Sequence, residues 1–386
     1  MASYTEALTA IPGYAQAKGS RQYVEVYGQD YAEGHYSDLL RTRIRLSSIG
    51  IGTFPGAATP LVDAQVAQCV SRGLRAGINV IDTAAHYRYG RALDAVGRGI
   101  RDACEAGVPR EGLFVISKGG FLTFEAGPPP DPRAWFEEHI AAKGLADVDD
   151  LANGIHVLSP AYIDHQIDLS RRRLGLETLD CFLIDQPEIH IPVIGKERLN
   201  EKLGAVFEVL ERAVLDNRIR CYGISTFDGF RAETDAAIFQ SLTSLLGWAE
   251  KAAQSAAGEA QARHHFRIAM LPFNQVMLEG FTRFNVATGQ GNVASTLQAA
   301  HQLNIYIMAS HTLLKGHLAQ QSTDIVASTL AELPPVQRAI QFNRSTPGLG
   351  TTLVGISQTA HLGDLTAVAR MPPLDRKAFL GMFARA

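Results

Sequence analysis

Three residues that can move a proton occur in two short runs of the sequence. Lys118 lies at the end of the mostly apolar run FVISK, and Asp82 and Tyr87 lie in the run DTAAHYRYGR. A buried ammonium is costly without a partner, and Asp82 is the natural one. Such a pair would stabilise a tyrosinate and lower the phenol pKa toward neutrality, which suits Tyr87 to general acid catalysis. A structural salt bridge with a packed tyrosine fits the same spacing, so both interpretations stay open.

Eight short apolar or β-branched runs predict the strands that position these residues. They show little polar alternation, as expected of strands buried on both faces of a parallel sheet. The predicted strands are 48–52, 78–83, 113–118, 181–185, 220–225, 268–273, 305–310 and 351–355. Amphipathic segments predict helices at 63–76, 91–106, 160–174, 196–216, 229–246, 292–303, 334–343 and 359–369. Asp63 and Ser159 are the expected N-caps of two helices, and Gly77 and Gly175 the expected stops.

Eight alternations of strand and helix predict an α/β fold of the (β/α)8 TIM-barrel type, with the whole chain, 1–386, as one domain. The alternative is a doubly wound open sheet, which needs a glycine-rich turn that leads into a helix after an early strand. The run GIGTFPG at 50–56 is a poor candidate, because Pro55 spoils the helix start. In a barrel the C-terminal ends of the strands form the catalytic face, where Asp82 and Lys118 would meet.

The length beyond a minimal barrel falls into four segments. These are an N-terminal extension at 1–44, a long loop at 119–159, an Ala/Gln-rich insertion at 249–265 after the fifth strand, and a helical tail at 371–386. Loops that follow strands lie on the catalytic face, so 119–159 is expected to shape the site, unless it is a surface excursion. Its aromatic residues either contact a substrate with an apolar or ring surface or hold the loop down. They are Phe121, Phe124, Trp135 and Phe136.

Composition and charge exclude several classes of protein. Apolar residues make up 46% of the 386 residues, which excludes intrinsic disorder. The 36 Lys+Arg nearly balance the 39 Asp+Glu, and no segment is basic enough for a nucleic-acid footprint. The four cysteines form no CxxC pair and lie in apolar runs, so neither a disulfide framework nor a metal site is predicted. A signal peptide and a membrane span are absent from the pattern, so a cytoplasmic protein is expected.

The run DTAAHYRYGRALDAVG resembles the signature of the aldo-keto reductase family. Further runs resemble the family in the same order between residues 45 and 370. They are RLSSIGIGTFPG, FVISKGG, SRRRLGLETLDCFLID, IRCYGISTF, FNQVM and LVGISQTAHLGDL. The resemblance implies a (β/α)8 barrel that binds a nicotinamide dinucleotide without a Rossmann motif.

The resemblance also implies a catalytic tetrad of tyrosine, lysine, aspartate and histidine. Tyr87, Lys118 and Asp82 match the first three, whereas Asp185 stands where the family usually has histidine. Three hypotheses follow. In the first, Asp185 is protonated and polarises a carbonyl or enone. In the second, Asp185 is ionised, pairs with Lys118 and favours proton abstraction; in the third, the site is catalytically weak and binds a nucleotide for regulation. His190 either folds back as a substitute or is a solvated loop histidine.

The same resemblance implies a set of cofactor-binding residues. Gly52 and Thr53 match the segment near the pyrophosphate and ribose, and Thr312 and Leu313 match the turn that wraps the pyrophosphate. Ser225, Thr226 and Gln275 match the residues that contact the carboxamide, and Ser310 takes the place of an aromatic ring. Gly355, Ser357 and Asp364 match the segment that clamps the adenosine. Ser357 replaces the cation that often holds a 2′-phosphate, with Gln358 beside it. That favours NAD and leaves NADP open, because hydroxyl and backbone donors also bind phosphate.

Together these patterns predict an NAD(P)-dependent oxidoreductase that acts on a carbonyl, alcohol or enone of a small, partly apolar substrate. Two alternatives remain at this point. One is an isomerase or lyase that retains its cofactor and uses the altered tetrad for proton abstraction. The other is a nucleotide-binding regulatory protein with little catalysis. A small molecule is the expected partner in the first two cases, with no nucleic acid or membrane.

Overall fold

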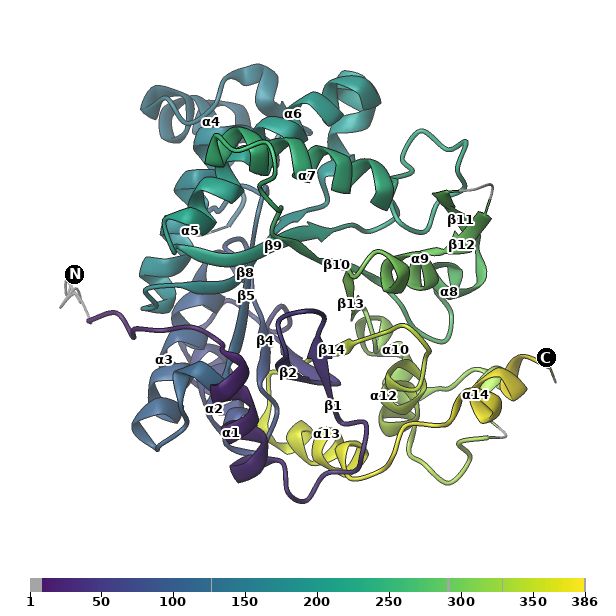
Figure 1. Ribbon diagram of the computed structural model, residues 1–386. Helices are drawn as coiled ribbons and strands as arrows, with labels where there is room; N and C mark the ends of the chain where they lie inside the picture. The colour runs from purple at the N-terminus through teal and green to yellow at the C-terminus, as the bar shows by residue number, and fades with distance from the viewer. Residues whose placement is uncertain (1–8, 126, 290–291, 328, 385–386) are drawn as a thin grey trace.

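A closed parallel barrel of eight strands forms the centre of the molecule (Figure 1). The computed structural model describes residues 9–125, 127–289, 292–327 and 329–384. The barrel strands are β3 (Ile49–Gly52), β4 (Val80–Asp82), β5 (Phe114–Gly119), β8 (Leu179–Asp185), β9 (Ile219–Ser225), β10 (Phe266–Pro272), β13 (Tyr306–Ser310) and β14 (Thr351–Gly355). All eight predicted strands are therefore confirmed, and β14 pairs with β3 to close the ring.

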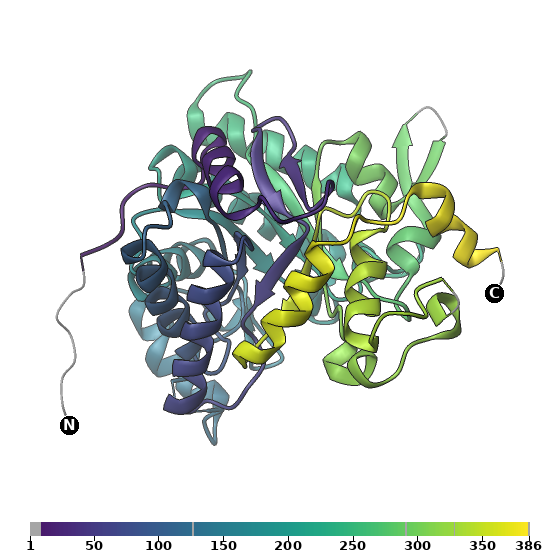
Figure 2. The same ribbon diagram turned by 90° about the horizontal axis from the view of Figure 1, so that it is seen from below.

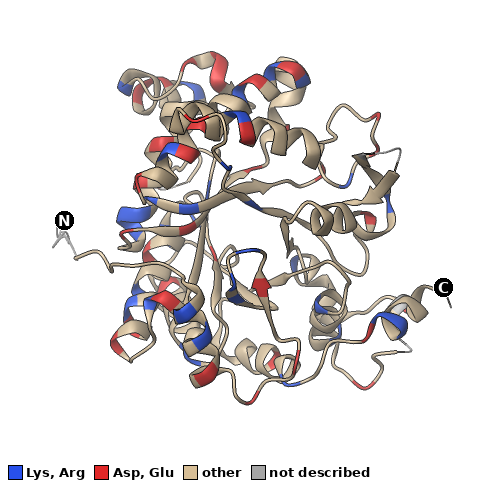
Figure 3. Ribbon diagram, viewed as in Figure 1, with Lys and Arg blue, Asp and Glu red and all other residues tan. Residues whose placement is uncertain are grey.

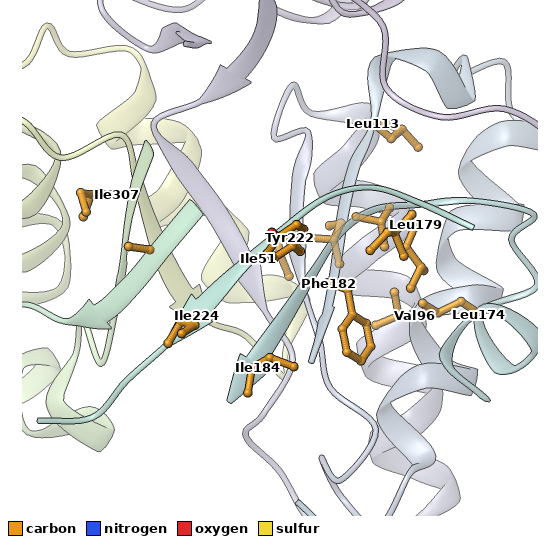
Figure 4. Close-up of a cluster of buried hydrophobic side chains, with 14 of the residues drawn as sticks. Ile51, Val96, Leu113, Leu174, Leu179, Phe182, Ile184, Tyr222, Ile224 and Ile307 are labelled. Carbon is orange, nitrogen blue, oxygen red and sulfur yellow. The ribbon is translucent and has the colours of Figure 1, made fainter. Parts of the chain in front are cut away.

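The strands are buried on both faces, which explains their continuous apolar character. One face packs against the surrounding helices, and the other fills the barrel interior. In Figure 4, Phe182 of β8 lies beside Val96 and Leu174, which come from two outer helices. Ile116 and Leu183 belong instead to the interior cluster.

The outer helices carry many of the charged side chains (Figure 3). The barrel strands also hold a few, namely Asp82, Lys118, Asp180, Asp185, Arg220 and Arg267. Lys118 and Asp82 are buried, so they need partners within the barrel. The helices that follow the barrel strands are α2 (Pro60–Arg75), α3 (Arg91–Glu105), α5 (Pro160–Leu174), α6 (Ile191–Leu215), α7 (Leu242–Ala257), α9 (Thr296–Gln302), α12 (Pro335–Arg344) and α13 (Leu362–Ala369).

One helix prediction is wrong over most of its length, and another begins too early. The segment 229–246 is mostly turn, and α7 begins only at Leu242, because Ser241 caps it by accepting a hydrogen bond from Ser244 N. Residues 249–257 of the Ala/Gln-rich segment expected as an insertion form the rest of α7. The segment 292–303 begins as a strand, and its helix starts after the capping residue Ser295.

The predicted helix caps are confirmed in part. Ser159 and Gly175 bound α5 as predicted. Thr59 rather than Asp63 caps α2, with Pro60 at the first helical position. Helix α2 ends at Arg75, and Gly77, directly after the C-cap residue Ala76, adopts a left-handed φ of 87° and stops the helix as predicted.

The N-terminal extension closes the barrel at the end opposite to the catalytic face. It holds α1 (Ala17–Tyr27) and the hairpin of β1 (Tyr36–Leu39) and β2 (Ile44–Ser47). Leu39 and Leu46 of the hairpin are buried in the same cluster as Val80, at the start of β4. Residues 1–8 of the predicted extension lie outside the described part of the chain.

The long loop after β5 folds into a small substructure with its own apolar cluster, which includes Phe136 and Val157. Its elements are α4 (Pro132–His139), β6 (Leu151–Ala152) and β7 (His156–Val157). A second excursion, which the sequence did not indicate, follows β10. It consists of α8 (Glu279–Thr282) and the hairpin of β11 (Phe284–Gly289) and β12 (Asn292–Ser295).

The C-terminal part adds short helices after β13 and a final helix after α13. The short helices are α10 (His317–Gln320) and α11 (Asp324–Ala327), and the final one is α14 (Arg376–Phe383). Phe379 of α14 packs with Phe273 and Phe342, beyond the end of β10. Figure 2 shows α14 and the first described residues on opposite sides of the molecule. Residues 385–386 of the predicted tail lie outside the described chain.

Candidate active site

A buried ion pair joins the C-terminal ends of β4 and β5. The two strands are parallel neighbours, with Asp82 in register with Ile116, two residues before Lys118. Lys118 Nζ lies 2.5 Å from Asp82 Oδ1, and the side chains are only 1% and 7% exposed. The ammonium also approaches the carbonyl oxygen of Thr83, at 3.4 Å.

Tyr87 lies on the turn that connects β4 to α3, and its hydroxyl oxygen is 2.8 Å from Lys118 Nζ. The turn is tight, because Arg88, Tyr89 and Gly90 all adopt positive φ angles of 49°, 57° and 83°. The Arg88 guanidinium anchors it by donating to Asp63 Oδ1 of α2 at 2.8 Å. Asp82, Lys118 and Tyr87 therefore form one continuous chain of charge-assisted contacts.

The electrostatics of this chain keep the lysine charged and the tyrosine protonated. Burial lowers the pKa of Lys118, but Asp82, Tyr87 and Asp185 together raise it more than burial lowers it, so the net shift is upward. For Asp82, burial raises the pKa and Lys118 opposes this. Burial raises the pKa of Tyr87 as well, in spite of Lys118. The predicted lowering of the phenol pKa toward neutrality is therefore wrong, because desolvation and the nearby carboxylates outweigh the cation.

Asp185 is the last residue of β8 and is buried at 4% exposure. Burial raises its pKa to about 6, although Lys118 and a hydrogen bond from Ser225 lower it. The carboxyl group therefore changes protonation state close to neutral pH. Asp82, not Asp185, is the carboxylate in contact with Lys118.

Two buried histidines support the backbone at Asp185. His156 Nε2 lies 2.7 Å from the carbonyl oxygen of Asp185, and its Nδ1 lies 2.9 Å from His190 Nε2. Burial lowers the pKa of His156 to about 3 and that of His190 to about 4, so both rings are neutral. His190 is thus neither a solvated loop residue nor a group in contact with Tyr87. A Cβ on Gly120 would lie 2.3 Å from His156 Nε2, so that position requires glycine.

Aromatic rings form a wall around Tyr87. Phe54 is 61% exposed, and its ring centroid lies 5.1 Å from that of Tyr87 in an edge-on arrangement. His86 lies 4.8 Å from Tyr87 on the same measure, and Phe121 lies 4.6 Å from His86. Of the four loop aromatics, only Phe121 thus reaches this wall.

The other three loop aromatics hold the loop together. Phe124 packs edge-on against Trp135 with a centroid distance of 4.9 Å, and Phe136 is fully buried. Trp135 in turn stacks on His139. Sequence reasoning missed His86 and Phe54, although both lie within the motifs that it singled out.

Two glycines let the first and last barrel strands approach each other closely. Gly52 and Gly355 are register partners. A Cβ on Gly355 would lie 2.9 Å from Pro55 Cγ, so the close packing of Pro55 on this strand end leaves no room for a side chain. Thr53 is buried, and its hydroxyl donates to the carbonyl oxygen of Asp82 at 3.0 Å. This places the segment 52–53 directly against the ion pair.

Gln275, just beyond the end of β10, is buried, and the two polar atoms of its amide differ in their contacts. Its Oε1 accepts hydrogen bonds from Thr323 N and Oγ1, at 3.1 and 3.2 Å. Its Nε2 is buried and has no partner among the described residues. Ser225 and Thr226, at the end of β9, are buried too, and the Thr226 hydroxyl accepts from Phe230 N at 3.3 Å.

The turn after β13 combines local strain with internal hydrogen bonds. His311, Leu314 and Lys315 have positive φ angles of 56°, 45° and 54°. The Thr312 hydroxyl donates to Leu353 O at 2.7 Å, so it ties β13 to β14. Leu313, beside it, packs on the main core.

The remaining predicted cofactor residues lie at the end of β13, just after β14 and on α13. Ser310 Oγ is 3.3 Å from His311 Nδ1. Ser357 is half-buried just after β14, and Asp364 on α13 accepts from Gln337 Nε2 at 2.9 Å.

Glu188 is a further residue that the sequence reasoning missed. It is buried, and its Oε1 accepts from Phe227 N and Asp228 N at 2.6 and 3.2 Å. It thereby fixes the backbone directly after Ser225 and Thr226. Within the described residues, no helix has the length and apolar character of a membrane span, and no cluster of three or more His, Cys, Asp or Glu suits a metal ion.

Comparison with known proteins gives a consistent picture. The model of the "Aldo/keto reductase family" matches residues 48–380. The "NADH-specific methylglyoxal reductase" of Escherichia coli is 28% identical over 149 residues, which cover 37% of this chain and 39% of that protein. The "D-galacturonate reductase" of Hypocrea jecorina is 37% identical over 79 residues, or 20% and 23% of the two chains. The chain thus matches well under half the length of these relatives.

Solved structures of similar fold include two bacterial enzymes. An aldo-keto reductase of Bacillus halodurans in its holo form has a TM-score of 0.60 at 15% identity, over 90% of this chain and 95% of that one. An aldo/keto reductase of Klebsiella pneumoniae in complex with NADP and acetate has a TM-score of 0.57 at 18% identity, over 90% and 94%. At this level of identity the likeness concerns the fold.

Proposed function

The chain belongs to the aldo/keto reductase family, and from this premise we propose that it is an NAD(P)-dependent oxidoreductase that interconverts a carbonyl or enone and its reduced form. The observation that carries the proposal is the contact chain from Asp82 through Lys118 to Tyr87, at 2.5 and 2.8 Å, on the catalytic face of the barrel. The aromatic wall of Phe54, His86 and Phe121 supports a small substrate with an apolar or ring surface.

The residues at the strand ends fit a nicotinamide dinucleotide. The buried Gln275 Nε2, which has no partner in the described part of the chain, would donate to a carboxamide oxygen. Gly355, at the end of β14, has no side chain and is exposed, so a pyrophosphate can approach its backbone closely. We assign Ser225 and Thr226 at the end of β9, Ser310, Thr312 and Leu313 at and after the end of β13, and Asp364 on α13 to the same cofactor site.

When bound, a reduced nicotinamide supplies a hydride with its electron pair to the carbonyl carbon. Tyr87 gives its phenolic proton to the carbonyl oxygen, so the C=O bond becomes an alcohol and the phenolate is reprotonated from water. Lys118 stabilises that phenolate through the 2.8 Å contact, and Asp82 holds the ammonium in place. The raised pKa of Tyr87 keeps the proton available at neutral pH.

Asp185 is the residue that orients the substrate in this proposal. Its protonated form donates a hydrogen bond to the substrate oxygen, whereas its ionised form would repel a developing oxyanion. The isomerase alternative needs Asp185 to be paired with Lys118. Lys118 is instead paired with Asp82, and this favours the oxidoreductase.

For the cofactor we propose a preference for NAD(H). Ser357 and Gln358 offer no cation for a 2′-phosphate. The Escherichia coli relative is named NADH-specific, while the Klebsiella pneumoniae structure contains NADP. Mass spectrometry of the denatured purified protein identifies which dinucleotide, if either, is carried along.

The proposal is tested by following the absorbance of NADH and NADPH during incubation with methylglyoxal and with D-galacturonate, the substrates in the names of the two relatives. We expect Tyr87→Phe to lower kcat by about 10²- to 10⁴-fold. Tyr89→Phe is the matched control, because Tyr89 lies on the same turn and is exposed. Unchanged turnover in Tyr87→Phe would overturn the assignment of the proton donor.

A further inference from the structure

His86 lies next to Tyr87 in the chain and faces Asp185 across the site. Its Nε2 is 3.9 Å from Asp185 Oδ2, and its side chain is 20% exposed. Tyr87 packs edge-on against the imidazole, and Phe121 covers it from the side of the long loop. In the part of the chain that the structure describes, neither nitrogen of this ring is assigned a hydrogen bond.

The distance between the His86 ring and the Asp185 carboxyl group limits how the two side chains can interact. At 3.9 Å it is too long for a hydrogen bond between His86 and Asp185. Two donors at this separation can nevertheless each reach the same oxygen atom at about 2.8 Å, if that oxygen sits between them. The gap therefore has the width of one shared acceptor.

The surroundings keep the imidazole neutral. Burial, Lys118 and His156 lower the pKa of His86 to about 3. The charged and titratable groups near the two side chains are Asp82 of β4, Tyr87 of the turn, Lys118 of β5 and His156 of β7. A neutral imidazole has one N–H group, and a protonated carboxyl has one O–H group, so each can donate once.

We propose that His86 Nε2–H and the protonated carboxyl of Asp185 converge on the substrate oxygen, and that this pair supplies the polarisation that a single histidine provides in the family pattern. The inference rests on the proposed function and adds His86 as a second catalytic residue. Neither group loses its proton in the step, because Tyr87 gives the proton to the oxygen. Ionisation of Asp185 places a negative charge beside that oxygen, so reduction slows as the pH rises through the pKa of Asp185.

The kinetic test measures kcat/KM for methylglyoxal with NADH and NADPH as a function of pH. We expect His86→Leu to lower it about 10²-fold or more, and His86→Gln, which keeps an amide N–H near the position of Nε2, to recover part of the loss. Asp185→Asn, which keeps a donor without a charge, should abolish the fall in activity above pH ~6. His301→Gln is the matched control, because His301 is exposed on α9, away from the site.

A second readout does not depend on turnover. Long-range proton–nitrogen NMR of the imidazoles, with the His86 signals assigned by their loss in His86→Gln, reports the tautomer in the intact protein. We expect a neutral ring that carries its proton on Nε2 at pH 6. A charged ring, or a proton on Nδ1, would overturn the inference. So would full activity of His86→Leu when Tyr87→Phe is inactive, whereas the absence of turnover in the wild type with every substrate would count against the proposed function instead.

Discussion

Lys118 Nζ lies 2.5 Å from Asp82 Oδ1 in a place where the two side chains are 1% and 7% exposed. Removal of one partner leaves the other charge buried and unpaired. We expect Asp82→Asn to lower the free energy of unfolding by about 3–5 kcal/mol, measured by urea denaturation. The double variant Asp82→Asn/Lys118→Met should recover much of that loss.

A surface pair provides the comparison for this prediction. Arg133 and Glu137 form an exposed ion pair at 3.2 Å on α4. We expect Glu137→Gln to change the free energy of unfolding by less than about 1 kcal/mol. Equal losses for the buried and the exposed pair would show that burial does not govern the strength of the Lys118–Asp82 contact.

Asp185 should make the stability of the protein depend on pH. Its pKa is raised from 3.8 to about 6, so its contribution is greatest below pH ~4 and is lost as the pH rises through 6. Asp185→Asn removes this titration. We expect its stability relative to the wild type to increase by up to about 3 kcal/mol between pH 4 and pH 8, measured by urea unfolding. A difference that does not vary with pH would contradict the raised pKa.

We expect Gln275 to contribute to the affinity for the cofactor rather than to the stability of the free protein. Its Nε2 has no partner among the described residues, so Gln275→Leu removes a donor that only a ligand would use. We expect about a tenfold loss of affinity for the reduced dinucleotide, measured by fluorescence titration. Thr323→Val controls for the hydrogen bond that Gln275 Oε1 accepts. The same affinity in Gln275→Leu and the wild type would exclude Gln275 from the cofactor site.

Ser357 should decide between the two dinucleotides. An arginine at this position would supply a cation for the 2′-phosphate. We expect Ser357→Arg to shift the ratio of NADPH to NADH affinity by about tenfold toward NADPH. Ser244→Arg adds the same charge at an exposed position on α7 and should leave the ratio unchanged. If both variants shift the ratio equally, the effect is one of net charge rather than of local contact.

The barrel could be predicted from the sequence because each strand is a short apolar run, and that pattern does not depend on the tertiary contacts. The turns in the segment 229–246 could not be predicted, because its apolar residues follow a helical spacing although tertiary contacts determine their positions. Phe230 is buried in the core, and Arg231 is bound to Glu279 of α8. Long-range contacts thus overrode the local helical preference.

The predicted site residues were found where a short motif contains them, as with Asp82 and Tyr87. His156 could not be found in this way. It lies 29 residues before Asp185 in the sequence and reaches it only because the long loop folds back as the β6–β7 hairpin. The rise in the pKa of Tyr87 could not be predicted either, because the sequence indicates the nearby Lys118 but not how deeply Tyr87 is buried.

The hairpin of β1 and β2 that closes the barrel has a consequence for the order of folding. Thr351 Oγ1 of the last strand donates to Ser47 O at 2.8 Å, across 304 positions of the chain. Tyr306 of β13 similarly lies within hydrogen-bond distance of Ser37. A segment made early in synthesis thus finds these partners only after nearly the whole chain has emerged. Such distant contacts make ring closure a late and slow event, during which the exposed apolar face of the hairpin would be open to chaperones.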